Sequence, residues 1–252
     1  CVPDDLTFDY IRNNYDVPCN EMAFALDYST VEPLRILLDS QFSVAVVGKK
    51  EAARTNVVRT LLVDVAENIF DRPAEVTIID GMTRELAEWA DQPFVTSYCS
   101  DGSELGVVLE DLDMRLAGRY DRVRNEGLEA LADEPYLIVV VHAGDALAIA
   151  SESKETVDLY NRMAKQYAAM RVLFVFSGID DGQVSFSSPG MLKAIKEERR
   201  AFVAMPLGEH KMYDINGVVV RANKAPLEVG QVFYVSGQDV SRVKLATSEG
   251  RA

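Results

Sequence analysis

The sequence contains little cysteine and little histidine. Three of its 252 residues are cysteine (Cys1, Cys19 and Cys99), without any Cys-x-x-Cys spacing, and two are histidine, His142 and His210. A sparse and odd number of cysteines is typical of a reducing compartment rather than of a disulfide-stabilised secreted domain. Two histidines without paired cysteines cannot supply a zinc cluster. We therefore expect neither a disulfide framework nor a metal site.

Basic residues and long apolar runs are also scarce. The chain has 26 Lys and Arg against 40 Asp and Glu, a formal net charge of -14. Phosphate backbones are bound by Lys and Arg, so this balance argues against a DNA- or anionic-membrane-binding surface and leaves room only for a local basic patch. The longest apolar run, Leu137 to Val141 with its flanks, fits a buried strand and is far too short for a membrane span. Because the chain begins at Cys1 without Met, we expect it to be part of a longer protein.

What the sequence does contain is a regular alternation of strand and helix patterns. Continuous apolar, β-branched runs alternate with segments whose apolar residues recur at helical spacing. Such alternation predicts a parallel sheet covered by helices on both faces. The predicted strands are Val44–Val47, Val76–Ile79, Phe94–Tyr98, Leu137–Val141 and Val172–Phe176, and the predicted helices are Thr55–Phe70, Arg84–Ala90, Glu104–Arg124, Glu155–Met170 and Met191–Arg199.

Both ends of the chain depart from that alternation. Residues 201–252 hold short β-rich segments separated by glycine ("RAFVAMPL", "GVVVRA", "GQVFYVSG" and "SRVKLAT"), which predict edge strands or hairpins that finish the sheet. Residues 1–40 contain "MAFALDY" and "LRILLD", which predict a small strand pair leading into the sheet. We therefore predict one domain over 1–252, with a core at 41–200, a leading segment at 1–40 and a β extension at 201–252.

The stretch "SVAVVGKKEAARTNVVRTLL", residues 43–62, has the outline of a phosphate-binding loop. The pattern G-x-x-x-x-G-K-[ST] is met at Gly48 and Thr55, but Ala53 replaces the second glycine and Arg54 replaces the lysine. The second glycine allows close approach of the backbone to phosphate, and arginine is longer and more planar than lysine. The loop is thus compatible only with weak anion binding. If it is inactive, we expect a collapsed loop in which Arg54 pairs with a carboxylate such as Glu51.

A nucleotide-hydrolysing site also needs an acid at the end of a neighbouring strand, to position Mg²⁺. The best strand lies in "YLIVVVHAGD", residues 136–145, and carries His142 and Ala143 where an Asp-Glu pair would fall. Neutral histidine is a poor substitute, since Mg²⁺ prefers oxygen ligands. Asp145 lies too far round the turn, and Asp80 ends a different strand. We predict no catalytic residue and no useful ATP hydrolysis. A blander alternative is an accidental glycine after a strand, with His142 a satisfied core or rim histidine.

Several segments resemble a known family. "FALDYSTVEPLRILLDSQFSVAVVGKKEAARTNVVRTLL" resembles the opening of an ATPase domain of the FtsK/SpoIIIE family, and is most like the type VII secretion ATPases EssC and EccC. Leu26-Asp27 and Glu32-Pro33 hold family positions, and Arg119-Tyr120 match a family helix element. "YLIVVVHAGD" occupies the Walker B place. "AAMRVLFVFSG" ends in Phe176-Ser177-Gly178, where active members carry Thr-Gln-Arg.

The resemblance implies a RecA-like P-loop fold and a degenerate, later ATPase domain of a multi-domain chain. Its altered phosphate contacts would be Gly48, Arg54 and Thr55, with no cofactor expected and ATP with Mg²⁺ bound weakly at most. It implies a cytoplasmic domain of a membrane-anchored motor that exports WXG100-type substrates, with neighbouring ATPase domains of the same polypeptide as partners and a hexamer in the full protein. The domain would act without hydrolysis, by packing and by recognising the substrate's export signal. The alternatives are a weakly competent ATPase and an FtsK-like DNA translocase.

Overall fold

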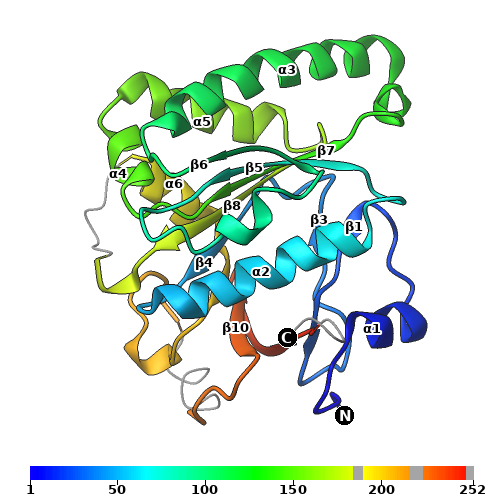
Figure 1. Ribbon diagram of the computed structural model, residues 1–252, viewed down its shortest axis with the longest axis vertical. Coiled ribbons are helices and arrows are strands. Elements are labelled where there is room, and N and C mark those ends of the chain that lie inside the picture. Colours follow the sequence, from blue (N-terminus) through cyan, green and yellow to red (C-terminus); the bar gives the residue numbers. More distant parts are fainter. Residues whose placement is uncertain (184–189, 216–223, 248–252) are drawn as a thin grey trace.

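The computed structural model describes residues 1–183, 190–215 and 224–247, and its centre is a nine-stranded sheet (Figure 1). The strands from β9 to β6 run parallel, and β10, β11 and β2 extend the sheet antiparallel. The predicted mostly parallel sheet with added β-strands is confirmed. In spatial order the strands are β2 (Ala25–Asp27), β11 (Asp239–Leu245), β10 (Gln231–Ser236), β9 (Arg200–Val203), β4 (Ser43–Val47), β8 (Val172–Ile179), β7 (Tyr136–Val141), β5 (Ala74–Ile79) and β6 (Val95–Cys99).

Helices cover both faces of this sheet, which is why its central strands are apolar throughout. Every residue of β4, β7 and β8 is buried. One face packs against α1 (Phe8–Asn14) and α2 (Glu51–Glu67). The other packs against four helices, of which α3 and α5 are drawn above the sheet in Figure 1. These are α3 (Glu104–Glu126), α4 (Ala146–Ser151), α5 (Lys154–Gln166) and α6 (Met191–Glu198).

Several predicted boundaries are wrong for local reasons. The helix predicted over Thr55–Phe70 begins earlier, at Glu51, because no glycine interrupts Glu51-Ala52-Ala53. The segment Arg84–Ala90 forms only the 3-10 turn η1 (Ala87–Trp89), since Asp80 Oδ2 accepts the Leu86 N–H at 2.8 Å and holds the chain in a loop. The predicted helix Glu155–Met170 ends at Gln166, and α1 and α4 have no predicted counterpart. The helix predicted to Arg199 ends at Glu198, since Arg199 is left-handed.

The two ends of the chain pair differently from the prediction. β1 (Glu21–Met22) pairs with β3 (Ile36–Leu37) in a separate two-stranded sheet, whereas β2 between them joins the main sheet beside β11. "RAFVAMPL" forms β9, which is an interior strand parallel to β4 rather than an edge strand. β10 and β11 form the predicted hairpin. "GVVVRA", residues 217–222, lies outside the described residues. The remaining 3-10 turns are η2 (Leu128–Leu131), η3 (Asp181–Gln183) and η4 (Leu207–Glu209).

Candidate functional site: the altered phosphate loop

The sheet order brings the two predicted halves of the site to one edge. β4 ends before Gly48 and β7 ends before His142, and only β8 lies between these two strands. Because the strands are parallel, their carboxyl ends meet at the edge where α2 begins. Gly178 in β8 makes the approach possible: a Cβ built there would lie 2.6 Å from the Ala143 carbonyl oxygen. The sheet therefore places His142 against the start of α2.

The loop after β4 is too short to surround a phosphate. Only Gly48, Lys49 and Lys50 separate β4 from α2, so residues 51–53 are helical where a working loop would be open. Gly48 faces the chain that follows β9, where a Cβ would meet the Ala204 carbonyl oxygen at 3.0 Å. The Ala204 N–H also donates to Val47 O at 2.8 Å. The glycine thus accommodates the protein's own backbone.

Arg54 turns inward and occupies the base of the loop. Arg54 as a whole is only 7% exposed. Nε donates to the Ser177 carbonyl oxygen at 3.0 Å, and Nη1 donates to the Gly48 carbonyl oxygen at 2.5 Å. Burial lowers the pKa of the guanidinium, and the nearby carboxylates of Asp180 and Glu51 oppose that shift. The loop is collapsed as expected of an inactive one, but the hydrogen-bond partners of Arg54 are two main-chain carbonyls rather than Glu51.

Thr55, His142 and Ser177 form a buried chain of hydrogen bonds. The Thr55 hydroxyl donates to Glu51 O at 2.9 Å, so it accepts from His142 Nε2, also at 2.9 Å. His142 Nδ1 lies 2.7 Å from Ser177 Oγ, and we assign the single hydroxyl proton of Ser177 to it rather than to the more distant Val141 carbonyl oxygen at 3.4 Å. This arrangement satisfies a neutral imidazole at both nitrogens. Burial acts in the same direction, because it lowers the pKa of His142.

Carboxylates surround the outer side of this cluster. Glu51 Oε1 accepts the Thr83 hydroxyl at 2.6 Å and lies 4.0 Å from His142 Nε2. On the opposite side of the loop, Lys49 pairs with Glu209 at 3.3 Å. A phosphate entering here would meet the Glu51 carboxylate, while the nearest arginine is already engaged with the main chain. The Glu51 carboxylate therefore repels an anion at this point, whereas the exposed Lys49 and Lys50 beside it attract one.

The residues present do not fit a magnesium–nucleotide complex. The Thr55 hydroxyl already has its donor and acceptor partners, and Ala143 has no ligand atom. Asp80, the other strand-terminal acid, accepts from Gly81 N, Leu86 N and the Tyr98 hydroxyl. Within the described ranges no group of three or more His, Cys, Asp or Glu side chains could hold a metal ion.

The structure places the sequence-derived candidates in one cluster and adds two residues to it. Gly48, Arg54, Thr55 and His142 lie together, and Ala143 lies behind them against Gly178. Ser177 and Glu51 complete the cluster. Sequence reasoning gave Ser177 no role in it and expected Glu51 only as an ion-pair partner of Arg54. Ser177 had a signal, since it is a polar residue inside the apolar strand "VLFVFSGI". The contacts of Glu51 with Thr83 and His142 had no such signal, because its position depends on the early start of α2.

Comparison with known proteins gives several relatives among secretion ATPases. No protein-family model matches the sequence. The chain is 23% identical over 228 residues to the ESX secretion system protein EccC of Geobacillus thermodenitrificans, covering 89% of this chain and 15% of that protein. The cytoplasmic domain of EssC matches with a TM-score of 0.74 at 20% identity, over 99% of this chain and 48% of that one. This chain has the fold of an EssC/EccC-type ATPase domain.

A further structure of the EssC/EccC type also matches. Thermomonospora curvata EccC (ATPases 2 and 3), in complex with a signal sequence peptide, gives a TM-score of 0.69 at 14% identity, over 98% of this chain and 44% of that chain. The fold implied by the sequence resemblance, that of an EssC/EccC-type ATPase domain, is thus confirmed. The chain spans less than half the length of each relative named here. In the described ranges, no helix is both long and apolar enough to cross a bilayer.

Proposed function

We propose that this chain is a non-hydrolysing, ATPase-like domain of a type VII secretion motor. The observation that carries the proposal is the position of Arg54, whose guanidinium binds the carbonyls of Gly48 and Ser177 inside the collapsed loop. A lysine in a working loop is free to neutralise the β- and γ-phosphates, whereas this arginine is committed to the main chain. The place of the Mg²⁺-binding acid is taken by His142, itself engaged with Thr55 and Ser177.

Such a domain acts by binding other proteins or domains rather than by hydrolysing ATP. We propose that it packs against neighbouring ATPase domains of the same polypeptide, in the cytoplasmic part of a membrane-anchored protein that assembles as a hexamer. Support comes from the relatives, since one solved chain contains ATPases 2 and 3 of EccC and this chain matches 44% of it. The same structure holds a signal sequence peptide, which supports the further proposal that the domain recognises the export signal of a WXG100-type substrate.

Calorimetric titration of the 252-residue chain with ATP and Mg²⁺ tests the loss of nucleotide binding. At protein concentrations that detect millimolar affinity, we expect no heat of binding and no thermal shift, because the phosphate space is filled by the chain's own groups. Binding that is weakened both by Arg54→Ala and by removal of Mg²⁺ would contradict the proposal. That result would favour the alternative of a weakly competent ATPase, for which the retained Gly48 and Thr55 are the specific support.

A further inference from the structure

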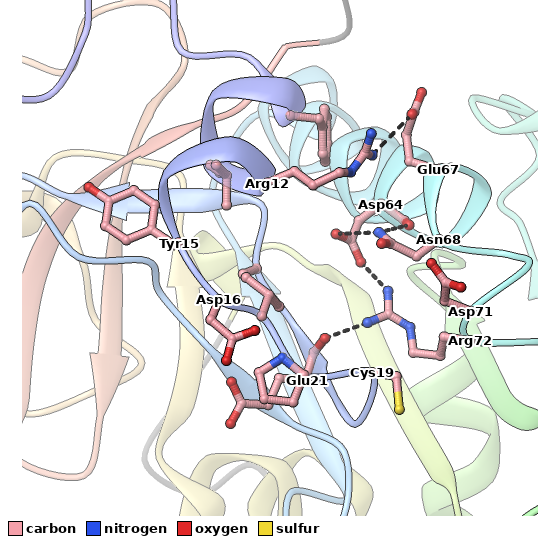
Figure 2. A pocket seen from close by; sticks show the side chains of 15 residues that line it. Arg12, Tyr15, Asp16, Cys19, Glu21, Asp64, Glu67, Asn68, Asp71 and Arg72 are labelled. Carbon is pink, nitrogen blue, oxygen red and sulfur yellow. Dashed lines mark hydrogen bonds and ion pairs between the residues drawn. The ribbon is translucent and has the colours of Figure 1, made fainter.

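A second concave site lies far from the phosphate loop, between α1 and the carboxyl end of α2 (Figure 2). Its volume is about 540 Å³. Segment 15–21, which follows α1, forms one wall, and residues 64–72 at the end of α2 form the other. We call this site the α1–α2 groove. Because no residue of the phosphate-loop cluster lines it, its role is separate from that of the loop.

The charged groups of the groove are predominantly acidic. Five carboxylates line it and only two arginines do so; these residues are Asp16, Glu21, Asp64, Glu67, Asp71, Arg12 and Arg72. Both arginines are already engaged, since Arg72 binds Asp64 and Glu21 O while Arg12 pairs with Glu67 at 3.3 Å. Asp16 and Asp71 are exposed, and among the described residues neither carboxylate has an ion-pair or hydrogen-bond partner. The groove therefore has a net negative charge and two carboxylates available to a partner.

The helix that ends here strengthens the same preference. The last turn of α2 contains no basic residue, although the carboxyl end of a helix carries a partial negative charge that a cation stabilises. Asp64, Glu67 and Asn68, which belong to that end, all line the groove. The dipole of a 17-residue helix thus adds to the field of Asp16 and Asp71.

The groove also has apolar surface to offer. Tyr15 and Val17, which are partly exposed, line it together with the buried Phe8, Ile11 and Ala23. Phe70 directly precedes the lining residue Asp71 in the sequence and is 94% exposed, so a large apolar side chain stands in solvent at the end of this segment. Large apolar side chains with such exposure, next to a concave site, are typical of protein interaction surfaces. A small cation would use the carboxylates alone and leave this apolar surface in water.

We propose that the α1–α2 groove is a docking site for a basic segment of a partner protein, which inserts an Arg or Lys side chain between Asp16 and Asp71 and packs apolar residues against the groove wall and Phe70. The inference is independent of the proposed function, because it uses no residue of the phosphate loop. Charge complementarity selects the partner: a cationic peptide is attracted, and an acidic peptide or phosphate-bearing surface is repelled.

The probe is a blocked, fluorescently labelled 12-residue peptide of leucine, alanine and arginine, with leucine and arginine on opposite faces of a helix. Its binding to the 252-residue chain is measured by anisotropy at low and high salt. The groove variant Asp16→Lys/Asp71→Lys should bind about tenfold more weakly or worse. The matched control Glu110→Lys/Asp121→Lys changes the net charge equally on exposed positions of α3, across the sheet, and should stay within about twofold. The control is necessary because the whole chain is acidic.

Native cysteines report the position of the peptide without any mutation. Cys19 is exposed and lines the groove, whereas Cys1 is exposed and does not line it. Bound peptide should slow alkylation of Cys19 several-fold, as followed by mass spectrometry, and leave Cys1 unchanged. Equal loss of binding in the groove and control variants would overturn the proposal. So would unchanged alkylation of Cys19 at a saturating peptide concentration, or undiminished binding of a peptide in which serine replaces leucine.

Discussion

At the scale of single residues, the altered loop keeps the positive charge of a phosphate-binding loop but uses it to bind the main chain. Arg54 retains the positive charge of the phosphate-loop lysine, but its longer, planar group donates to two main-chain carbonyls through two different nitrogens. Both carbonyls are then satisfied by a charged donor, which is among the stronger hydrogen-bond types. Arg54 has therefore become part of the structural core.

This role predicts a stability cost for Arg54→Ala. Truncation leaves the Gly48 and Ser177 carbonyls without their buried donor, so the free energy of unfolding should fall by about 2–3 kcal/mol. Chemical denaturation followed by circular dichroism measures the change. The control is Arg59→Ala on the same helix, whose side chain is 45% exposed and pairs with Glu88; it should cost less than about 1 kcal/mol. Equal costs for both variants would show that Arg54 is not held as described.

His142 predicts a dependence of stability on pH. Its folded-state pKa lies below its ordinary value of 6.5, because burial favours the neutral ring. Between these two pKa values the unfolded chain binds more protons than the folded chain. The stabilisation is therefore fully present above pH 6.5 and is lost as pH falls through the window below it.

The variant His142→Gln isolates this contribution, since glutamine can hydrogen-bond to Thr55 and Ser177 but does not titrate. We expect its melting temperature to fall less than that of the wild type between pH 7.5 and pH 5.5, in scans at about half-unit steps. The lowered pKa of buried His210 acts in the same direction and remains in both proteins. Parallel pH profiles for the two proteins would mean that His142 does not stay neutral when folded.

At the scale of elements, the decisive feature is the start of α2. Starting at Glu51, the helix incorporates Ala52 and Ala53 into its first turn. Glycine loses more conformational freedom than alanine in a helix, so Ala53→Gly should lower the free energy of unfolding by about 0.5–1 kcal/mol. Ala52→Gly should cost a similar amount. An open phosphate loop would instead tolerate glycine at position 53 alone, and denaturation curves of the two variants distinguish these cases.

The elements that sequence analysis predicted best are those whose residues form a continuous apolar run, a pattern typical of a buried strand. β4 and β7 are continuous apolar runs with every side chain buried, and both were found within a residue of their bounds. Trp89, expected in the core, is buried and packs against Phe94. α1 was missed because it is seven residues long, with only Phe8 and Ile11 buried. A helix of that length depends on tertiary packing rather than on propensity.

The assembly of the loop cluster could not be read from the sequence. His142 meets Thr55 across 87 positions and Ser177 across 35, and these contacts depend on the strand order and on the close approach at Gly178. The start of α2 was misplaced because the phosphate-loop pattern suggested an open loop, whereas alanine at position 53 allows the helix to continue. The phosphate-loop pattern thus named residues that lie together in the structure, but it predicted the wrong backbone conformation for residues 51–53.

At the scale of the whole molecule, charge decides which large partners are possible. The formal net charge is -14, which repels nucleic acid at long range. The mixed-charge stretch "KAIKEERR" at 193–200 offers little compensation. Arg199 donates to Gly237 O and Arg200 donates to Ser43 O, while Lys193 lies 3.9 Å from Glu197. The basic groups that could hold phosphates are therefore engaged within the chain.

The translocase alternative can be tested on this basis. A translocase must hold the phosphate backbone, and non-specific DNA binding of that kind has Kd values of about 10⁻⁴ to 10⁻⁶ M at physiological salt. We expect this chain to show no retention of a labelled duplex at protein concentrations up to about 10⁻⁴ M. Lys193→Glu, an exposed change at the mixed-charge stretch, should leave this result unchanged. Retention that falls steeply with added salt and is lost in Lys193→Glu would instead reveal a phosphate-binding patch, because each released counterion contributes to the slope.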